Sequence, residues 1–592
     1  MSLIYINQFN RNSLYQNTLG FSDGSGQAVQ MENTTCPAMG NCRASTPIAG
    51  QFPIALQFSR PTQNISIYLF LIIALMPIFS CQTKPQAPPV PTQIKNEILA
   101  SHIADQWTYE GARLNIYIHA IAEDLSGIKY NLINAPDFIK IKTNKGEAEI
   151  IVDATKGTTG RYDIYMQIKN GNKTTDRNFN ILIKKPKAEI YYSDAANGDD
   201  NNPGTYKKPW KSLQNINLQK NKSSEILLLL KPGHYQNNDF NKLDFNKINI
   251  MPAAGGNAKL GAFTFSESEN IILKSLTIEP KSICPQTAFV EIKNNCQNIE
   301  ISNCKIQAAE NYDNWGNPNW KEKIKSGIFT WGKNILIKNN LLRNVFHGME
   351  INGDVCLIDH NIVDRFGGDA IRNTGSNNAF DFNTLKNAVV DDYYDEGGNH
   401  DDLFQAWTFD EPVEYVRISN NIGVAYADND LLFPSKIVQG LVNFDGFSEN
   451  WLIENNLVLT DHPHGIALLG AKDCNIINNT VARNPRRDHD FESPPWIMIA
   501  DHKDGRPSSG NMVQNNLTSA LRITENAATA DHNVVMDSTY SRYFVDYPGW
   551  DFHLKKGSGC IDAGSAFFSP KKDLDGKKRP AEEGADVGCY EL

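Results

Sequence analysis

The chain has little cysteine, little net charge for its length and no long hydrophobic run. Only 10 of its 592 residues are cysteine, and they form no CxxC pair or other metal-ligand spacing. Most are expected to be small core residues, although Cys560 and Cys589 are a candidate pair. The net charge of -10 argues against nucleic acid or anionic lipid as the main partner, because an acidic surface repels both. The apolar run at residues 68–79 is too short for a comfortable transmembrane helix.

Residues 1–81 predict a leader with a lipoprotein-type signal segment. The run ends in IFSC, which resembles a bacterial lipobox and implies cleavage before Cys81 and lipidation of that cysteine. The proline-rich residues 82–94 predict an extended tether. We therefore expect a protein of the bacterial cell envelope, anchored by lipid in the periplasm or on the outer surface, with no other membrane contact. Residues 1–60 are unusually long for such a leader and predict a misplaced start or a dispensable segment; the alternative is a signal anchor that keeps them inside the cell.

Residues 95–185 predict a small β-sandwich. Short strand patterns such as RLNIYIHAIA and YDIYMQIKN alternate with turns of glycine, asparagine, aspartate and proline. The segment from Tyr109 to Ile141 resembles bacterial immunoglobulin-like domains found beside carbohydrate-active modules. That resemblance implies a spacer more than a binding module.

Residues 188–592 predict a parallel β-helix. Seven alternating apolar runs, among them NILIKNNLL, CLIDHNIV and WLIENNLV, end in an asparagine that precedes another apolar residue. Asn340, Asn361 and Asn383 are 21 and 22 residues apart, the length of one coil of three short strands. An asparagine at a fixed corner can bond the coils above and below it through its side-chain amide.

Both ends of this region resemble secreted proteins of the pectin-lyase-like superfamily. The opening, residues 190–217, matches their N-terminal cap, and the segments GCIDAGS and DLDGKKRPAEEGADVGCYEL match their C-terminal segment. The resemblance implies an all-β protein, a right-handed parallel β-helix preceded by the immunoglobulin-like sandwich. It leaves the reaction open, because the superfamily includes lyases, hydrolases, epimerases and adhesins.

Strands of successive coils lie in register about 4.8 Å apart, so outward side chains form columns. We align five strands by the inward residues Met349, Ile371, Phe404, Val442 and Ile466. The outward column is then Glu350, Arg372, Gln405, Asn443 and Ala467, and the residues at the strand entry are His347, Asp369, Asp402, Gly440 and His464. Such a mixture of acid, base, amide and imidazole predicts a polysaccharide-binding face; the alternative is a solvated polar face.

The predicted substrate-binding residues are the polar members of these columns and one aromatic residue: His347, Glu350, Asp369, Gln405, Asn443, His464 and Trp407. The tryptophans that can stack on sugar rings are Trp315, Trp320, Trp331 and Trp407.

An acidic insertion, residues 391–402, precedes one of these strands. Members of the superfamily carry a His-Asp pair followed by a glutamine, and His400, Asp401, Asp402 and Gln405 match that pattern. The candidate Ca²⁺ ligands in the insertion are Asp391, Asp392, Asp395 and Glu396. Clustered carboxylates can also act as acid and base, or form a solvated loop. No cofactor other than Ca²⁺ is expected.

A lyase acting on an acidic, uronate-containing polysaccharide is the predicted activity. β-Elimination needs a cation to neutralise the sugar carboxylate, a base for the C5 proton and a proton for the leaving oxygen. The predicted catalytic residues are His400, Arg372, Asp402 and Lys503. The alternative functions are a glycoside hydrolase or uronan epimerase on the same fold, or a non-catalytic glycan-binding or adhesive surface protein. For Lys503 alone, the alternative is a solvated charged turn. A monomer is expected.

Overall fold

The computed structural model describes most of the chain from Glu97 onward. The described residues are 97–592 except 219–224, 237–238, 311, 313–314, 316–319, 321, 390–400, 409–410, 430, 432–433, 436, 487–490 and 582. The predicted leader, the lipidation site Cys81 and the tether lie outside these residues. Within them, no helix has the length and hydropathy needed to cross a membrane.

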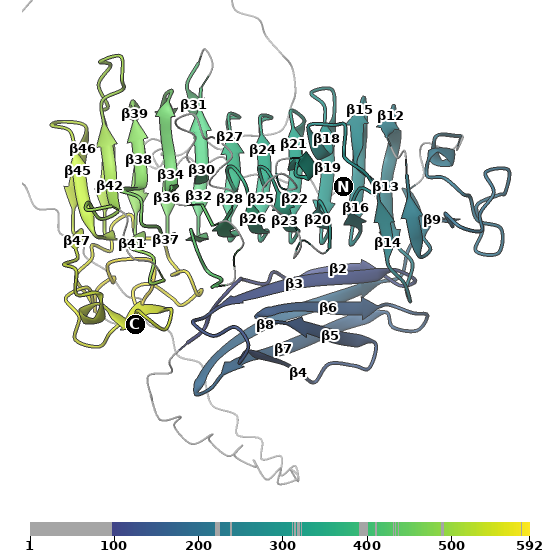
Figure 1. The fold of residues 1–592 in the computed structure, drawn as a ribbon, viewed down its shortest axis with the longest axis horizontal. Helices are drawn as coiled ribbons and strands as arrows, with labels where there is room; N and C mark the ends of the chain where they lie inside the picture. The colour runs from purple at the N-terminus through teal and green to yellow at the C-terminus, as the bar shows by residue number, and fades with distance from the viewer. Residues whose placement is uncertain are drawn as a thin grey trace, which may run out of the picture. The chain divides into compact units, whose positions relative to one another are not determined.

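Three long parallel sheets form most of the molecule, and Figure 1 shows their strands stacked side by side. In the described residues, sheet 1 has 13 strands, sheet 2 has 12 and sheet 3 has 11. The chain passes through the sheets in the same order in each coil, as in β22, β23 and β24. This confirms the right-handed parallel β-helix implied by the resemblance to the pectin-lyase-like superfamily.

The strands of sheet 1 are β9 (Glu189–Ser193), β10 (Glu225–Leu230), β13 (Asp244–Pro252), β16 (Glu269–Lys274), β19 (Gln297–Ser302), β22 (Lys333–Lys338), β25 (Leu357–Asp359), β28 (Ala379–Asp381), β32 (Arg417–Ser419), β36 (Leu452–Glu454), β40 (Asn475–Ile477), β43 (Asn511–Gln514) and β46 (Ala528–Asp531). The strands of sheet 2 are β11 (Gly233–Tyr235), β14 (Ala258–Leu260), β17 (Thr277–Ile278), β20 (Lys305–Gln307), β23 (Leu341–Val345), β26 (Ile362–Phe366), β29 (Thr384–Ala388), β33 (Ile422–Val424), β37 (Leu457–Leu459), β41 (Thr480–Ala482), β44 (Leu517–Thr518) and β47 (Val534–Val535). The strands of sheet 3 are β12 (Phe240–Asn241), β15 (Phe263–Ser266), β18 (Ala288–Ile292), β21 (Ser326–Thr330), β24 (Met349–Ile351), β27 (Ile371–Asn373), β30 (Asp401–Trp407), β34 (Val438–Asp445), β38 (His464–Leu469), β42 (Trp496–Ala500) and β45 (Ala520–Ile523).

An asparagine ladder fixes the corner between sheets 1 and 2. The side-chain amide of Asn340 donates to Oδ1 of Asn361 at 2.9 Å, and Asn361 donates in the same way to Asn383 at 3.0 Å. Each amide also donates to a backbone carbonyl of a neighbouring coil, as Asn361 does to Ile337. The same bonds continue through Asn421, Asn456, Asn479, Asn516 and Asn533. The predicted role of the recurring asparagine is confirmed.

Residues 98–184 form two four-stranded sheets that pack face to face. One sheet has the order β1 (Leu99–Ala100), β3 (Arg113–Ile121), β6 (Glu147–Asp153), β5 (Ile139–Asn144); the other has the order β2 (Gln106–Tyr109), β8 (Lys173–Lys184), β7 (Gly160–Asn170), β4 (Lys129–Ile133). Alternating residues such as Ile116, Ile150 and Met166 bury their side chains between the sheets. This is the predicted β-sandwich; its immunoglobulin-like relationship stays a prediction.

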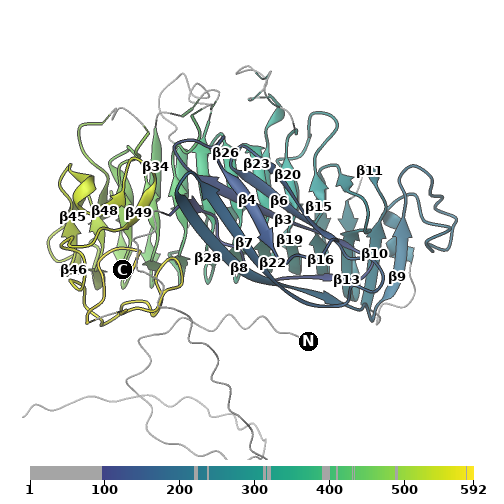
Figure 2. The ribbon, with the colours of Figure 1, turned by 90° about the horizontal axis from the view of Figure 1, so that it is seen from below.

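The sandwich packs against sheet 2 of the β-helix: it lies below the coils in Figure 1 and in front of them in Figure 2, which is seen from below. The amide of Asn303, at a coil corner, donates to Gln106 and to the carbonyl of Asn115, both at 2.9 Å. Arg343 of β23 donates to the carboxylate of Glu147 on β6. Sheet 2 is therefore covered here by the sandwich.

Short elements complete the described structure. The strands β31 (Val413–Glu414), β35 (Ser448–Glu449) and β39 (Ala471–Lys472) form a small parallel sheet, and β48 (Phe544–Asp546) pairs with β49 (Asp551–Leu554). The 3-10 helices are η2 (Gln214–Leu218) and η4 (Tyr540–Arg542). Cys560 and Cys589 are free and buried, so the candidate disulfide is absent.

Candidate functional site

The outward face of sheet 3 carries the predicted column in three neighbouring coils. Glu350 of β24 pairs in register with Arg372 of β27, and Arg372 pairs with Gln405 of β30. The inward residues Met349, Ile371 and Phe404 also pair as predicted. One acid, one base and one amide therefore lie side by side across three coils, spanning roughly 10 Å.

The predicted register is wrong by one residue at β34. Leu441, not Val442, pairs with Phe404, so Val442 follows Gln405 in the column. Asn443 is 0 % exposed, and its amide donates to Ser448 at 2.7 Å, which removes it from the predicted substrate-binding set. The error has a physical cause, because Leu441 and Val442 are both apolar and give the alternation two equally good phases.

The corrected register also fills the gap left at Gly440. Gln439 pairs with Asp402, so the residues at the strand entry are His347, Asp369, Asp402, Gln439 and His464. The sequence alignment with Val442 inward does not include Gln439. An alignment with Leu441 inward places Gln439 at the strand entry.

These entry residues form a hydrogen-bonded edge. The backbone N–H of Asp369 donates to Nδ1 of His347 at 2.9 Å, and the N–H of Asp402 donates to Oδ1 of Asp369 at 2.9 Å. Further along, Nδ1 of His464 lies 2.7 Å from Oε1 of Gln439. His347, Asp369 and Asp402 are buried, so they support the face more than they line it.

Arg372 is held in place on two sides. Its Nε donates to the carboxylate of Asp369, and its guanidinium lies 5.3 Å from the ring centre of Trp407. Its side chain keeps 22 % exposure, whereas the Asp369 side chain keeps 1 %. A guanidinium oriented by a buried carboxylate and an aromatic ring can offer its remaining N–H groups to a bidentate anion such as a sugar carboxylate.

Glu350 lies beside Arg372 in an environment that changes its acidity. Burial raises the pKa of Glu350, and the Ser326 hydroxyl and the Arg372 charge only partly oppose that effect. Glu350, His347 and Ser326 line a surface hollow of about 440 Å³. Burial and the Arg372 charge hold the pKa of His347 well below its usual range, so this imidazole is neutral at pH 7. Glu350 is therefore the candidate proton carrier, a role the sequence analysis did not give it.

Aromatic rings extend the face on both sides of Arg372. Phe329 pairs in register with Glu350, its ring lies edge-on to Trp331, and Trp331 is 41 % exposed. Trp407 is half-buried on the other side. Trp315 and Trp320 are buried in a separate apolar cluster, so they cannot stack on a glycan as predicted. Exposed rings spaced along a sheet suit the apolar faces of sugars.

Lys503 belongs to a neighbouring part of the face. Its Nζ lies 2.6 Å from Oδ1 of Asp445, and Asp445 pairs in register with Trp407. Asp445 lies two strands from Arg372, and strands two apart in a sheet are separated by roughly 10 Å. One extended glycan can therefore contact both cations.

The acidic insertion lies mostly outside the described residues. His400 and the predicted Ca²⁺ ligands Asp391, Asp392, Asp395 and Glu396 are all among the residues that the structure does not describe. Asp401 and Asp402 are described, and both are buried at the start of β30. The roles predicted for His400 and for Ca²⁺ stay predictions.

No protein-family model and no curated protein matches the chain. Solved structures similar to it include the pectate lyase Pel9A, with a TM-score of 0.41 and 18% identity over 69% of this chain and 97% of that one. A rhamnogalacturonan lyase has a TM-score of 0.32 and 14% identity over 60% and 91% of the two chains. The GH136 lacto-N-biosidase from Eubacterium ramulus has a TM-score of 0.36 and 13% identity over 59% and 68%.

Proposed function

We propose that this chain is a carbohydrate-active enzyme that binds an acidic polysaccharide along sheet 3 and cleaves it by β-elimination. The observation that carries the proposal is the fixed guanidinium of Arg372, which lies between Glu350 and Gln405 with aromatic rings on either side. A uronate sugar combines an anionic carboxylate with an apolar ring face. These are the two features that an oriented arginine and exposed aromatic rings bind.

In this mechanism, Arg372 pairs with the C6 carboxylate of a uronate residue. Neutralising that carboxylate acidifies the C5 proton, which Glu350 accepts from its position next to Arg372. The electrons of the C5–H bond form the C4–C5 double bond, and the C4–O bond breaks. The leaving oxygen takes a proton from water or from His400, which then acts as the general acid.

The remaining groups position the chain. Gln405 presents an amide to sugar hydroxyls in the next coil, and Lys503 offers a second cation to a carboxylate farther along the glycan. The buried Asp369 orients Arg372, and Asp402 belongs to the edge that holds Asp369. The polysaccharide is expected to cross several coils, because the polar and aromatic residues follow the sheet and not a closed cavity.

Incubation of the full chain with uronate-containing and neutral polysaccharides tests this proposal. We expect ultraviolet absorbance from an unsaturated uronide to appear only with an acidic glycan, and to be lost in Arg372→Ala. New reducing ends without that absorbance would replace the lyase by a hydrolase. Binding with no product would make the chain a glycan-binding or adhesive protein.

A glycoside hydrolase is the second candidate, and the raised pKa of Glu350 favours it. A half-buried carboxyl group whose pKa is raised by burial is a better proton donor to a glycosidic oxygen at mildly acidic pH than an exposed one. The wild-type product separates the two candidates, because only a lyase forms an unsaturated uronide. Glu350→Gln should abolish product formation in either case, and full activity of this variant would remove Glu350 from both mechanisms.

We also propose a Ca²⁺ site in the acidic insertion. Hard carboxylate oxygens such as those of Asp395 and Glu396 are the ligands Ca²⁺ prefers, and the ion would help Arg372 to neutralise the substrate. Asp395→Asn should then weaken activity in a way that excess Ca²⁺ relieves. A defect that Ca²⁺ does not change would remove the ion from this proposal.

The proposed location rests on the sequence alone. We propose that Cys81 carries the lipid that anchors the protein to the bacterial envelope. Membrane fractions should release the protein only with detergent, and Cys81→Ala should leave it soluble or unprocessed. Recovery of residues 1–60 on the mature protein would contradict this proposal.

A further inference from the structure

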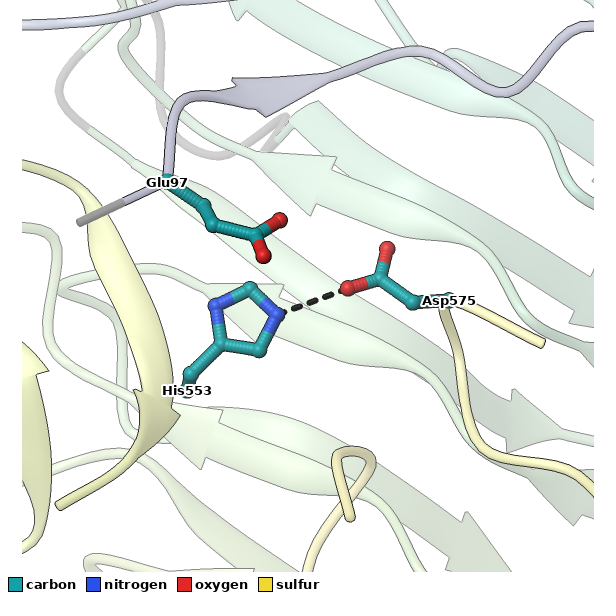
Figure 3. A group of neighbouring side chains, drawn as sticks. All are labelled: Glu97, His553 and Asp575. Atoms are coloured by element: carbon teal, nitrogen blue, oxygen red, sulfur yellow. Dashed lines mark hydrogen bonds and ion pairs between the residues drawn. The ribbon is translucent and has the colours of Figure 1, made fainter. Parts of the chain in front are cut away.

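A histidine and three carboxylates converge where the first described residues meet the C-terminal segment. Figure 3 shows Glu97, His553 and Asp575 pointing toward one another. Their ligand atoms all lie within 4.8 Å of one another. Nε2 of His553 lies 2.7 Å from Oδ2 of Asp575, and its Nδ1 lies 2.7 Å from Oδ1 of Asp551. No step of the proposed glycan chemistry uses these four residues.

The cluster holds more negative than positive charge in a place that water barely reaches. The side chains of Asp551, His553 and Asp575 are 0 %, 16 % and 17 % exposed. Burial raises the pKa of Glu97, and the charges of Asp575 and Asp551 add to that rise. Arg177 is the one arginine among the groups that act on Glu97. Three carboxylates against one imidazole and one guanidinium leave a buried site that a further cation would stabilise.

A cavity of the right size lies in the cluster. It has a volume of about 10 Å³ and is lined by Glu97, Asp551, His553 and Asp575, together with Arg177 and Trp550. That volume is about the space of one water molecule or one ion. Trp550 is 1 % exposed, and its indole N–H is buried without an acceptor. A hydrated ion in the cavity would bring a ligand oxygen that this donor lacks.

The geometry points to a metal site in which Nε2 of His553 and carboxylate oxygens of Glu97 and Asp575 bind one divalent transition-metal ion. Asp551 would accept the Nδ1–H of His553, which is the usual way in which a carboxylate orients a metal-binding imidazole. One imidazole nitrogen with two carboxylate oxygens suits Zn²⁺ better than Ca²⁺ or Mg²⁺, which prefer oxygen ligands alone. Water would complete the coordination.

The ion would join three separate parts of the chain. Glu97 lies just before β1 of the sandwich, His553 lies on β49, and Asp575 lies in the C-terminal segment. The existing bond from the N–H of Glu97 to Oδ2 of Asp551, at 2.7 Å, already brings two of these parts together. The proposed site is thus structural, and it would hold the sandwich against the end of the β-helix.

Binding replaces a proton. Both ring nitrogens of His553 lie 2.7 Å from a carboxylate oxygen, so the metal-free imidazole carries a proton at Nε2 toward Asp575. When the metal binds, the Nε2 proton leaves to solvent and the freed lone pair forms the metal bond, so binding should release about one proton per ion and should weaken at lower pH.

The test is calorimetric titration of the full chain with Zn²⁺, first at pH 7 and then at pH 6 and 8. We expect one saturable site that raises the thermal unfolding midpoint with Zn²⁺ concentration. Glu97→Gln and His553→Gln should each remove that site, and Asp551→Asn should weaken it by about 10- to 100-fold. Ca²⁺ in place of Zn²⁺ should give little heat and little thermal shift.

The matched control is His532→Gln, which removes an exposed histidine whose Nδ1 lies 2.7 Å from Oδ1 of the equally exposed Asp531. It should keep the full Zn²⁺ titration. If circular dichroism shows that His553→Gln does not fold, the Zn²⁺ titration of Glu97→Gln tests the proposal, because the Glu97 side chain is at the edge of the cluster. The proposal is overturned if both variants bind Zn²⁺ as the wild type does, or if the site prefers Ca²⁺.

Discussion

Two columns of charged residues arise from the same three coils, and only one of them is open. On sheet 2, Arg343, Asp364 and Lys386 pair in register, in the same way as Glu350, Arg372 and Gln405 do on sheet 3. The sandwich covers the first column, whereas the Arg372 side chain in the second keeps 22 % exposure, against 11 % for Arg343 in the first. A polar column in a β-helix therefore does not identify a binding site by itself. Whether another domain packs on the column determines whether a ligand can reach it.

The covered column neutralises its own charges. Asp364 is fully buried, 2.9 Å from Arg343 and 3.7 Å from Lys386, and it also pairs with Arg365. Burial raises its pKa, but Arg365, Lys386 and Arg343 outweigh burial and hold the pKa of Asp364 well below its usual range. Glu147 from the sandwich completes the network. Little charge remains there to bind a ligand.

The first prediction removes the centre of the covered column. Asp364→Ala should lower the free energy of unfolding by about 3–5 kcal/mol, because it leaves Arg343, Arg365 and Lys386 buried with one carboxylate fewer to neutralise them. Denaturant unfolding followed by circular dichroism measures this loss. The exposed Asp531→Ala is the control and should change stability by no more than about 0.5 kcal/mol. Equal stability of both variants would contradict the comparison.

The second prediction concerns the pH dependence of stability at the interface between the sandwich and sheet 2. Burial lowers the pKa of His119, which is 1 % exposed beside Asp364, to about 4. The unfolded imidazole binds its proton near pH 6.5 and the folded one does not, so stability falls as the pH drops from 6.5 to 4. His119 contributes about 3 kcal/mol to this fall. His119→Gln should therefore lose less stability on acidification than the wild type does; an unchanged pH profile would exclude His119.

The third prediction concerns the open column. Arg372→Ala should lower kcat/KM on the cleaved polysaccharide by about 10² or more, typical of losing an electrostatic contact to the reacting group. It should also lower the free energy of unfolding by about 1–3 kcal/mol, because it leaves the buried carboxylate of Asp369 without its cation, so unfolding is measured alongside activity. Arg522→Ala, at the far end of the same column, is the control. Equal loss of activity in both variants would mean that position along the face does not matter.

The fourth and smallest effect is expected at Lys503. Its pair with Asp445 is solvent-exposed, so Lys503→Met should change stability by less than about 1 kcal/mol. A contact with a distant uronate would instead raise KM several-fold for long chains and leave KM for the shortest cleaved fragment unchanged. Lys472→Met, which breaks an exposed pair with Glu449, is the matched control. A fall in kcat without a change in KM would instead show that Lys503 acts in the chemical step.

Much of the fold follows from the sequence because its determinants are local and repeated. The asparagine at each corner and the flanking apolar alternation specify the coil, and the pairing of Glu350 with Arg372 then follows from the period. The predicted register is wrong at β34, because the adjacent apolar residues Leu441 and Val442 fit the alternating pattern equally well. Alternation within one strand carries no information that resolves such a choice.

The environment of the site could not be predicted in the same way. The sequence does not show that the sandwich covers Arg343 and leaves Arg372 open, since that depends on packing between segments about 200 residues apart. Nor does it show that Trp320 is buried while Trp331 is exposed. Burial of Glu350, which raises its pKa, likewise arises from neighbours in other coils.

The most direct test of the open column is a crystal structure of Glu350→Gln with an oligosaccharide of the polysaccharide that the wild type cleaves. We expect sugar residues to cross the coils along sheet 3, with one carboxylate in hydrogen-bond distance of Arg372 and rings against Trp407. An oligosaccharide bound on any other face, with Arg372 left in contact with protein alone, would contradict the account.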